Sequence, residues 1–232
     1  MNKVLSTLII AAFAATPAWA ERPMAVDDAG TMDKGGAKVE FGWSRDDNTR
    51  GWDAAAGFAP IENLEFEVGF ARMHENIGGA PDARIRDLGF AAKWVPLKAE
   101  QGLSAGLKFE TGRSRSKVSG EPTETERAHS LTGLATWSFA SGQLLHVNIG
   151  REWLRADGPD DSNNTWGIGL DQPLTETLHL TLETFGNTSR DQGRPDKQIG
   201  LRWTVAEGLK ISGAVGNGNG RSFGGAGIAW EF

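Results

Sequence analysis

The chain ends with the stretch Phe223–Phe232, which reads FGGAGIAWEF. Ala226, Ile228, Trp230 and Phe232 share one parity of this stretch, while Gly225, Gly227, Ala229 and Glu231 occupy the other. Successive side chains of a β-strand point to opposite faces, so this two-residue period places the apolar residues together. The stretch therefore predicts a strand with one apolar face and one small or polar face.

The same alternation recurs along the chain. It is found in residues 36–45, 51–60, 64–73, 85–95, 102–112, 129–139, 144–154, 164–171, 178–186, 198–205, 209–216 and 223–232. In most of these segments one parity is almost wholly apolar, as in Leu64, Phe66, Val68 and Phe70. The other parity carries glycine, alanine, serine, threonine and charge, which is the apolar-out, polar-in repeat of a transmembrane barrel. The sequence predicts an all-β, antiparallel, up-and-down transmembrane β-barrel of about twelve strands.

The amino terminus has the pattern of a secretory signal peptide. A basic residue, Lys3, precedes an apolar run from Leu5 to Ala15, and Ala18-Trp19-Ala20 matches a cleavage site. We therefore expect a cleaved signal peptide at 1–20, a periplasmic or plug-like segment at 21–35 and the barrel at 36–232. Downstream of residue 20, no stretch approaches the roughly 18 apolar residues that a membrane helix requires.

The carboxyl-terminal strand carries a resemblance as well. An apolar strand that ends in phenylalanine resembles the terminal strand that outer-membrane barrels present to the barrel assembly machinery. The resemblance implies a location in the outer membrane of a Gram-negative bacterium, with Phe232 as the assembly signal.

A soluble β-sandwich or a lipocalin-like barrel would also show alternation, so the links between segments matter. Links after even-numbered segments are mostly tight, whereas several after odd-numbered segments are long and polar. The long links are His74–Arg84, Gly112–Ala128, Arg155–Asn163 and Asn187–Lys197. Twelve strands with both termini in the periplasm predict this difference, because such barrels have short periplasmic turns and longer outer loops.

Tryptophan and arginine are sorted by level along the expected strands. Two aromatic girdles are predicted at the membrane interfaces, comprising Trp43, Trp52, Trp153 and Trp166 at the outer ends and Trp94, Trp137, Trp203 and Trp230 at the periplasmic ends. Several arginines lie on the apolar parity of a strand, near its outer end. They are predicted to contact lipid and lipopolysaccharide phosphates at the outer rim. These residues are Arg45, Arg50, Arg72, Arg86 and Arg151. The alternative is that parity breaks down there and these arginines are solvated.

The opposite parity gives the residues expected to line the lumen. They are Lys38, Glu40, Asp53, Glu65, Glu67, Asp87, Lys93, Lys108, Glu110, His146, Glu152, His179, Glu183, Arg202, Lys210 and Glu231. Both signs occur, so one interpretation is a salt-bridged network that holds the interior. The other is a polar path whose acidic outer ring favours cations or neutral solutes. Many small residues on this parity, glycine above all, indicate space inside.

The stretch before the first strand does not alternate. It resembles the mature start of a family of proteobacterial outer-membrane proteins described as meta-pathway phenol degradation proteins, through Arg22, Pro23, Asp27, Asp28, Ala29, Gly30 and Thr31, followed by Lys34, Gly35 and Gly36 in a permuted spacing. The resemblance covers about fifteen residues and implies a barrel that moves hydrophobic or aromatic compounds. The segment could also enter the barrel as a plug, with its carboxylates meeting Lys38, Lys93 or Lys210.

These patterns favour a monomeric channel or passive transporter for a small-molecule solute over an enzyme. His129 and Ser130 are adjacent and so point to opposite faces, which is wrong for a lipase, and no motif supports His74, Asp82 and Asp87 as a protease site. The chain has no cysteine, and we expect neither cofactor nor metal. Its net charge of −6 argues against nucleic-acid binding. The remaining alternative is a structural barrel whose outer loops contact partners, with Gly112–Ala128 as the candidate surface.

Overall fold

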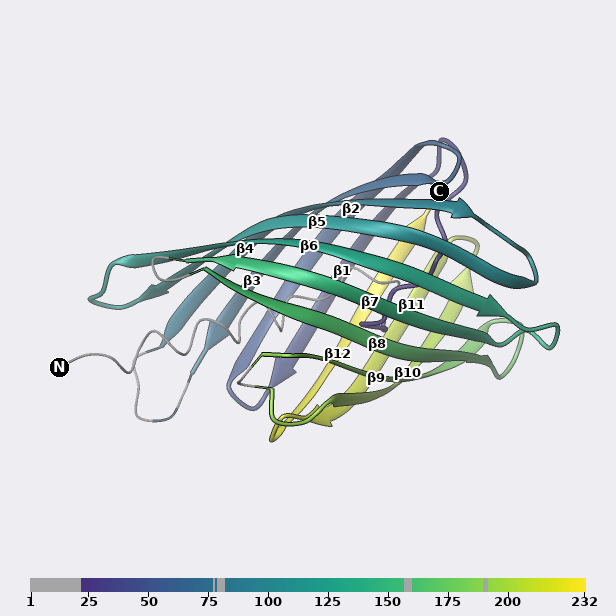
Figure 1. Cartoon of the computed structure of the whole chain (residues 1–232). Coiled ribbons are helices and arrows are strands. Elements are labelled where there is room, and N and C mark those ends of the chain that lie inside the picture. The colour runs from purple at the N-terminus through teal and green to yellow at the C-terminus, as the bar shows by residue number, and fades with distance from the viewer. Residues whose placement is uncertain (1–21, 77, 79–81, 157–159, 190–191) are drawn as a thin grey trace.

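The computed structural model describes residues 22–76, 78, 82–156, 160–189 and 192–232. Within them the chain forms a closed antiparallel barrel in which each strand pairs with its sequence neighbours and the first strand pairs with the last (Figure 1). The strands are β1 (Ala37–Asp46), β2 (Thr49–Ile61), β3 (Leu64–Glu75), β4 (Ala83–Leu97), β5 (Gly102–Val118), β6 (Thr123–Ser138), β7 (Leu144–Arg155), β8 (Asp161–Pro173), β9 (Leu178–Asn187), β10 (Asp196–Ala206), β11 (Leu209–Gly218) and β12 (Arg221–Glu231). The predicted twelve-stranded barrel is confirmed.

The seam of the barrel joins β1 to β12 along their whole length, from Lys38 opposite Glu231 to Asp46 opposite Phe223. Phe232 continues the seam, because it exchanges two backbone hydrogen bonds with Ala37. Its ring contacts the Trp230 ring at a centroid distance of 4.9 Å. We call this end of the barrel, where β1 begins and β12 finishes, the near end, and the opposite end the far end.

Two of the four links predicted to be long remain so, between Glu75 and Ala83 and between Asn187 and Asp196, whereas the other two are shorter than predicted. Most of Gly112–Ala128 is strand: β5 runs on to Val118 and β6 starts at Thr123, so only a tight turn remains at Gly120, whose φ of 87° suits glycine. The hairpin of β5 and β6 projects beyond the other strands (Figure 1). Here both faces of the two strands carry polar residues. This part of the hairpin therefore pairs without the apolar outer face that a membrane-spanning strand shows. Similarly, β8 begins at Asp161, inside the predicted Arg155–Asn163 link.

The outer surface of the barrel is apolar around its middle. Val68, Leu107, Ile149, Ile168 and Val215 have exposed fractions between 45 and 69%. A soluble monomer rarely exposes a contiguous apolar surface of this extent, whereas a membrane barrel presents such a band to lipid. None of the described residues forms a helix long and apolar enough to cross a bilayer.

The core of this protein lies inside the barrel and is largely polar. Interior positions include buried carboxylates, lysines and hydroxyls, which face the lumen between small residues. Part of the space is filled by residues 22–36, which precede β1 and pass into the lumen (Figure 1). The expected signal peptide, residues 1–20, lies outside the described residues.

Candidate functional site

Residues 22–36 line the inside of the barrel and contact most of its strands in turn. Arg22 lies against β1 and β2, Pro23 accepts a hydrogen bond from Gln198 of β10, and Val26 contacts Glu183 of β9. Asp27 then reaches β7, β5 and β4, and Met32 reaches Glu65 of β3. The segment therefore makes a circuit of the wall before it enters β1, and we call residues 22–36 the inner segment.

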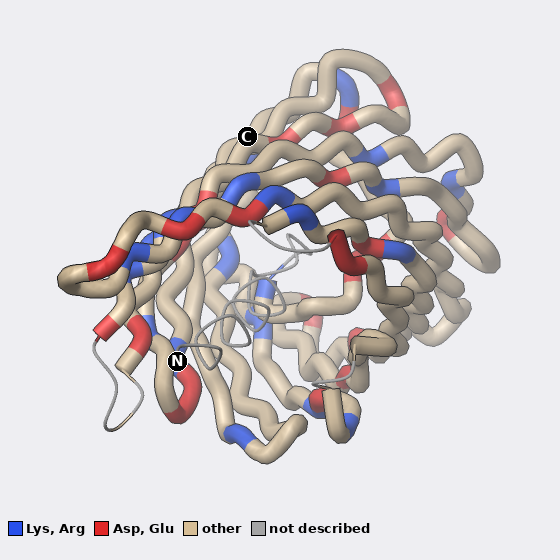
Figure 2. The backbone as a smooth tube through the Cα atoms, turned by 60° about the vertical axis from the view of Figure 1, so that its left-hand side comes forward, with Lys and Arg blue, Asp and Glu red and all other residues tan. Residues whose placement is uncertain are grey.

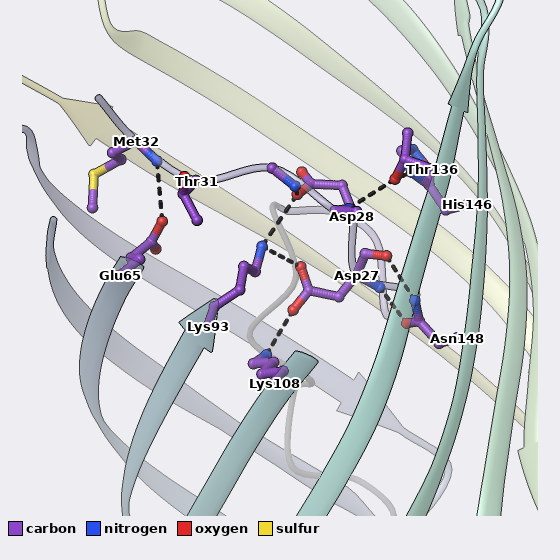
Figure 3. A network of polar contacts seen from close by, with 12 residues as sticks. Asp27, Asp28, Thr31, Met32, Glu65, Lys93, Lys108, Thr136, His146 and Asn148 are labelled. Carbon is purple, nitrogen blue, oxygen red and sulfur yellow. Dashed lines mark hydrogen bonds and ion pairs between the residues drawn. The ribbon is translucent and has the colours of Figure 1, made fainter. Parts of the chain in front are cut away.

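Asp27 joins the inner segment to two lysines of the wall (Figure 3). Its two carboxylate oxygens lie 2.8 Å from the Nζ atoms of Lys93 and Lys108, and Lys93 also lies 3.1 Å from Asp28. Burial alone would raise the pKa of the Asp27 carboxyl, but the two lysines outweigh it and hold the pKa below its ordinary value. Asp27 is thus an ionised counter-charge shared by two buried lysines, which Asp28 and Glu110 also contact.

Backbone amides of the inner segment are bound by side chains of the wall. The N–H groups of Ala25 and Val26 donate to Glu183 at 2.9 and 2.8 Å. Asn148 both accepts from the Asp27 N–H, at 2.7 Å, and donates to the Asp27 carbonyl, at 2.8 Å. The amides of Ala29 and Met32 donate to Thr136 and Glu65. The wall therefore supplies the acceptors that an extended chain without a strand partner needs.

Glycines of the wall leave the room that the inner segment occupies. A Cβ atom on Gly167 or Gly169 would lie 2.7 Å from Val26 or 2.5 Å from Met24, and one on Gly200 would lie 2.7 Å from Pro23. Cβ atoms on Gly42 and Gly227 would meet Arg22. The expectation that lumen glycines leave open space is therefore wrong for these positions: the inner segment fills that space.

The near half of the lumen holds a further network within the wall. Lys38 lies 2.8 Å from both Glu65 and Glu67, so it pairs with wall carboxylates rather than with the inner segment. Asp171 of β8 bonds to His179 at 2.6 Å and pairs with Arg202. The sequence reasoning missed Asp171, although it lies on the inward parity of its strand.

Above the inner segment, towards the far end, the lumen opens into a cavity of about 570 Å³, which we call the vestibule. Arg22–Asp27 form its floor, and turn residues such as Asn48, Gln192 and Asn219 line its mouth. Figure 2 shows the strands closing around the lumen, with charged positions recurring along the wall. The inner segment thus lies between the vestibule and the ion-paired near half.

Acidic side chains outnumber basic ones on the vestibule wall. Lys108 and Arg221 already lie beside carboxylates, since Lys108 pairs with Asp27 and Glu110, and Arg221 pairs with Asp46 and Asp196. The wall also carries Glu75, Asp87 and Glu152, for which the described residues show no ion pair. Acidic groups therefore predominate on the vestibule wall.

Apolar side chains also line the vestibule, and the sequence reasoning did not single them out. Met73, Ile85, Leu134, Leu154 and Phe185 point inward beside the acids. Each lies on the inward parity of its strand, so the alternation contained the signal, but the search for charged lumen groups passed over it. The vestibule is amphipathic rather than uniformly polar.

The remaining predicted site residues lie as follows. Glu231 is exposed at the near end rather than buried in the lumen, and Lys210 is half-buried on β11. The arginines of the expected outer rim, Arg45, Arg50, Arg72, Arg86 and Arg151, are exposed on the outer surface at the far end. Seven of the tryptophans assigned to girdles are exposed and Trp166 is half-buried.

The side chains considered for catalysis do not assemble. Ser130 faces inward, where it donates to Glu110, while the adjacent His129 is exposed on the other face. His74 lies 3.2 Å from Asp82 on the outer surface, but Asp87 points into the vestibule. Within the described part of the chain, no three histidine or acidic side chains are grouped so that they could hold a metal.

Solved structures similar to this chain are outer-membrane barrels. The COG4313 outer membrane channel from Pseudomonas putida F1 aligns with a TM-score of 0.61 at 9% identity, over 88% of this chain and 98% of its own. A KdgM porin in complex with disordered oligogalacturonate aligns with a TM-score of 0.58 at 11% identity, over 84% and 99%. The translocator domain of autotransporter NalP from Neisseria meningitidis also reaches 0.58 at 11% identity, over 88% and 91%. These likenesses show the fold.

In sequence, no curated protein matches the chain. The comparisons do not bring out the phenol-degradation family that the start of the inner segment resembles. A family model described as uncharacterised conserved protein UCP029691 matches residues 8–228, and the chain belongs to that family.

Proposed function

We propose that the protein is an outer-membrane channel of a Gram-negative bacterium for small, hydrophobic or aromatic compounds, with its far end towards the outside. The vestibule carries this proposal. It reaches from the far-end turns to the inner segment and combines apolar side chains with unpaired carboxylates. An apolar body could pack against Met73, Ile85 and Leu154, while the carboxylates favour neutral or cationic groups over anions.

The exterior supports a membrane location. The apolar band and the tryptophans near both strand ends are the features of a barrel in lipid. The similar folds of a porin and of an outer-membrane channel support the channel role, and the solute is inferred from the vestibule alone.

In this mechanism the inner segment is the gate. It crosses the lumen between the vestibule and the near half, and Asp27, Arg22 and Glu183 hold it to three parts of the wall. Passage requires that the segment shift or leave, because its side chains occupy the space beside Gly42, Gly167 and Gly169. We expect the resting channel to conduct weakly.

Liposome swelling with three small aromatic solutes tests the proposal. Refolded protein and a variant that lacks residues 22–33 are compared for uptake of benzylamine, benzyl alcohol and benzoate. We expect the deletion to accelerate uptake and the cationic and neutral solutes to enter faster than benzoate. Equal exclusion of all three by the deletion variant, with the heat-modifiable gel shift of a folded barrel intact, would contradict the channel function.

A structural barrel without transport is the second candidate, favoured by the hairpin of β5 and β6. This hairpin projects beyond the barrel and is highly charged, which suits contact with a partner (Figure 1). If the protein is a structural barrel, neither the intact protein nor the deletion variant should transport any of the three solutes.

A further inference from the structure

Two adjacent rows of side chains cross five strands on the outer surface at the far end, and basic residues predominate in both. In the first, cross-strand pairing links Arg45, Arg50, His74, Arg84 and Lys117. Like charges directly opposite one another destabilise a sheet. A row of this kind is therefore stabilised when an anion lies over it.

The second row lies one step closer to the middle of the barrel. It links Trp43, Trp52, Arg72, Arg86 and Arg115 in the same way. The two tryptophans occupy the β1–β2 side of this row, and the arginines occupy the β3–β5 side. Aromatic and cationic surface are thus adjacent at one level of the barrel.

Among the described residues, the arginines of these rows have no carboxylate within ion-pair distance. His74 pairs with Asp82, but among the described residues no carboxylate lies within ion-pair distance of Arg50, Arg72 or Arg84. No aspartate or glutamate occurs among the neighbouring residues 77 and 79–81 either. The three guanidinium groups are therefore available to an external anion.

The rows border a surface groove of about 300 Å³. Its lining includes Trp43, Trp52, Arg50, Arg72, His74 and Arg84. Below the groove, the Trp52 ring contacts the Phe41 ring at 6.0 Å and the Phe70 ring at 5.6 Å. An aromatic surface therefore runs from the cationic groove down into the apolar band.

The basic surface stops at the β1–β12 seam. The first row continues from Arg45 to Gly224 of β12, Val215 of β11 and Ile199 of β10, none of which is charged. On the β5 side, arginines continue across the pairing of Arg113, Arg127 and Arg155 onto β6 and β7. The groove differs from that surface because tryptophans of β1 and β2 adjoin its arginines.

We propose that this groove binds a phosphorylated lipid of the surrounding leaflet, lipopolysaccharide in an outer membrane. The phosphate lies among Arg50, Arg72 and Arg84, because the guanidinium fork matches phosphate oxygens. An acyl chain lies along Trp43, Trp52 and the aromatic rings below them. The site is on the outer surface of the barrel wall. The proposal therefore requires that the barrel lies in a membrane, but it does not require that the barrel transports a solute.

Native mass spectrometry of the refolded protein with purified lipopolysaccharide tests the site. The variant R50Q/R72Q/R84Q should bind roughly tenfold more weakly or worse, since each charge-assisted hydrogen bond contributes substantially to affinity. The control R151Q/R155Q/K197Q removes the same charge from other strands and should bind like the unmodified protein. An equal loss in both variants would show diffuse attraction and overturn the proposal.

Two further measurements keep the outcome decisive. R50K/R72K/R84K preserves the charge and removes the fork, so it should also lose affinity, and full retention would contradict the phosphate geometry. Inorganic phosphate should not displace the lipid, and displacement at equal concentration would mean that the groove takes a free anion instead. Solute uptake should be unchanged in all variants, which separates this site from the channel function.

Discussion

The two halves of the lumen differ in how their charges are satisfied. At the inner segment, Asp27 pairs with Lys93 and Lys108, and in the near half Lys38 pairs with Glu65 and Glu67. In the vestibule, carboxylates such as Asp87 and Glu152 line open space without ion-pair partners among the described residues. The near half is therefore held by ion pairs within its wall, whereas the vestibule wall keeps carboxyl groups without such pairs among the described residues.

The largest expected effect comes from removing the room that the inner segment needs. Gly169→Leu places a side chain where Met24 lies, so the segment should be displaced and single-channel conductance should rise several-fold. Gly213→Ala is the control, because a Cβ there would meet its nearest neighbour at 3.6 Å. Unchanged conductance in a folded Gly169→Leu barrel would mean that the segment does not block the lumen.

A smaller effect is expected when one charge of the inner segment is removed. Asp27→Asn leaves Lys93 with Asp28 and Lys108 with Glu110 as their remaining carboxylate partners. The cost should therefore fall below the roughly 3–5 kcal/mol of a fully broken buried ion pair. Openings in a planar bilayer should become more frequent. Asp33→Asn makes the same chemical change at a residue whose side chain is 99% exposed and should alter nothing. Equal behaviour of the two variants would refute the role assigned to Asp27.

The vestibule should respond in selectivity and not in gating. Asp87→Asn combined with Glu152→Gln removes two carboxylates from its wall. In a salt gradient, the reversal potential should shift in the direction that reports greater anion permeability. The frequency of channel openings should stay the same. The exposed pair Glu62→Gln and Glu207→Gln at near-end turns provides a control of equal charge. A change in opening frequency without a shift in reversal potential would mean that the vestibule controls gating and not selectivity.

The smallest effect concerns pH. The pKa of Asp27 is lowered on docking, so its contribution to docking is fully present above its ordinary pKa of about 4 and is lost only as pH falls through the depressed value. Opening frequency at pH 8, 6 and 5 should therefore not change through Asp27. An increase between pH 6 and 5 that Asp27→Asn abolishes would show that its carboxyl titrates there.

Much of the barrel could be predicted from the sequence, because alternation is a local property of each strand. The apolar parity of Leu64, Phe66, Val68 and Phe70 was sufficient to place β3. The far ends were not predictable in this way: from Arg113 and Arg127 outward both faces are polar, so strand and loop look alike.

The sequence predicted many of the residues that face the interior, but it did not predict which of them pair with one another. Parity placed Lys93 and Lys108 inside, and the plug hypothesis named Lys93 as a partner of the inner segment. The pairing of Asp27 with Lys108 depends on which strands face the segment as it passes around the wall, and that is a long-range property. The apolar vestibule residues were missed because only charged lumen groups were sought. Asp171 lies on the inward parity at the end of its predicted segment, and its pairing with His179 and Arg202 depends on neighbouring strands.

The contacts of the inner segment also bear on how this family can vary. Glu183, Asn148 and Thr136 bind backbone amides, which every residue except proline provides. The side chains of Ala25 and Ala29 take no part in those bonds. Mutations should therefore accumulate in the segment more freely than at the glycines that face it, and relatives could share the docked path while differing in the sequence that follows it.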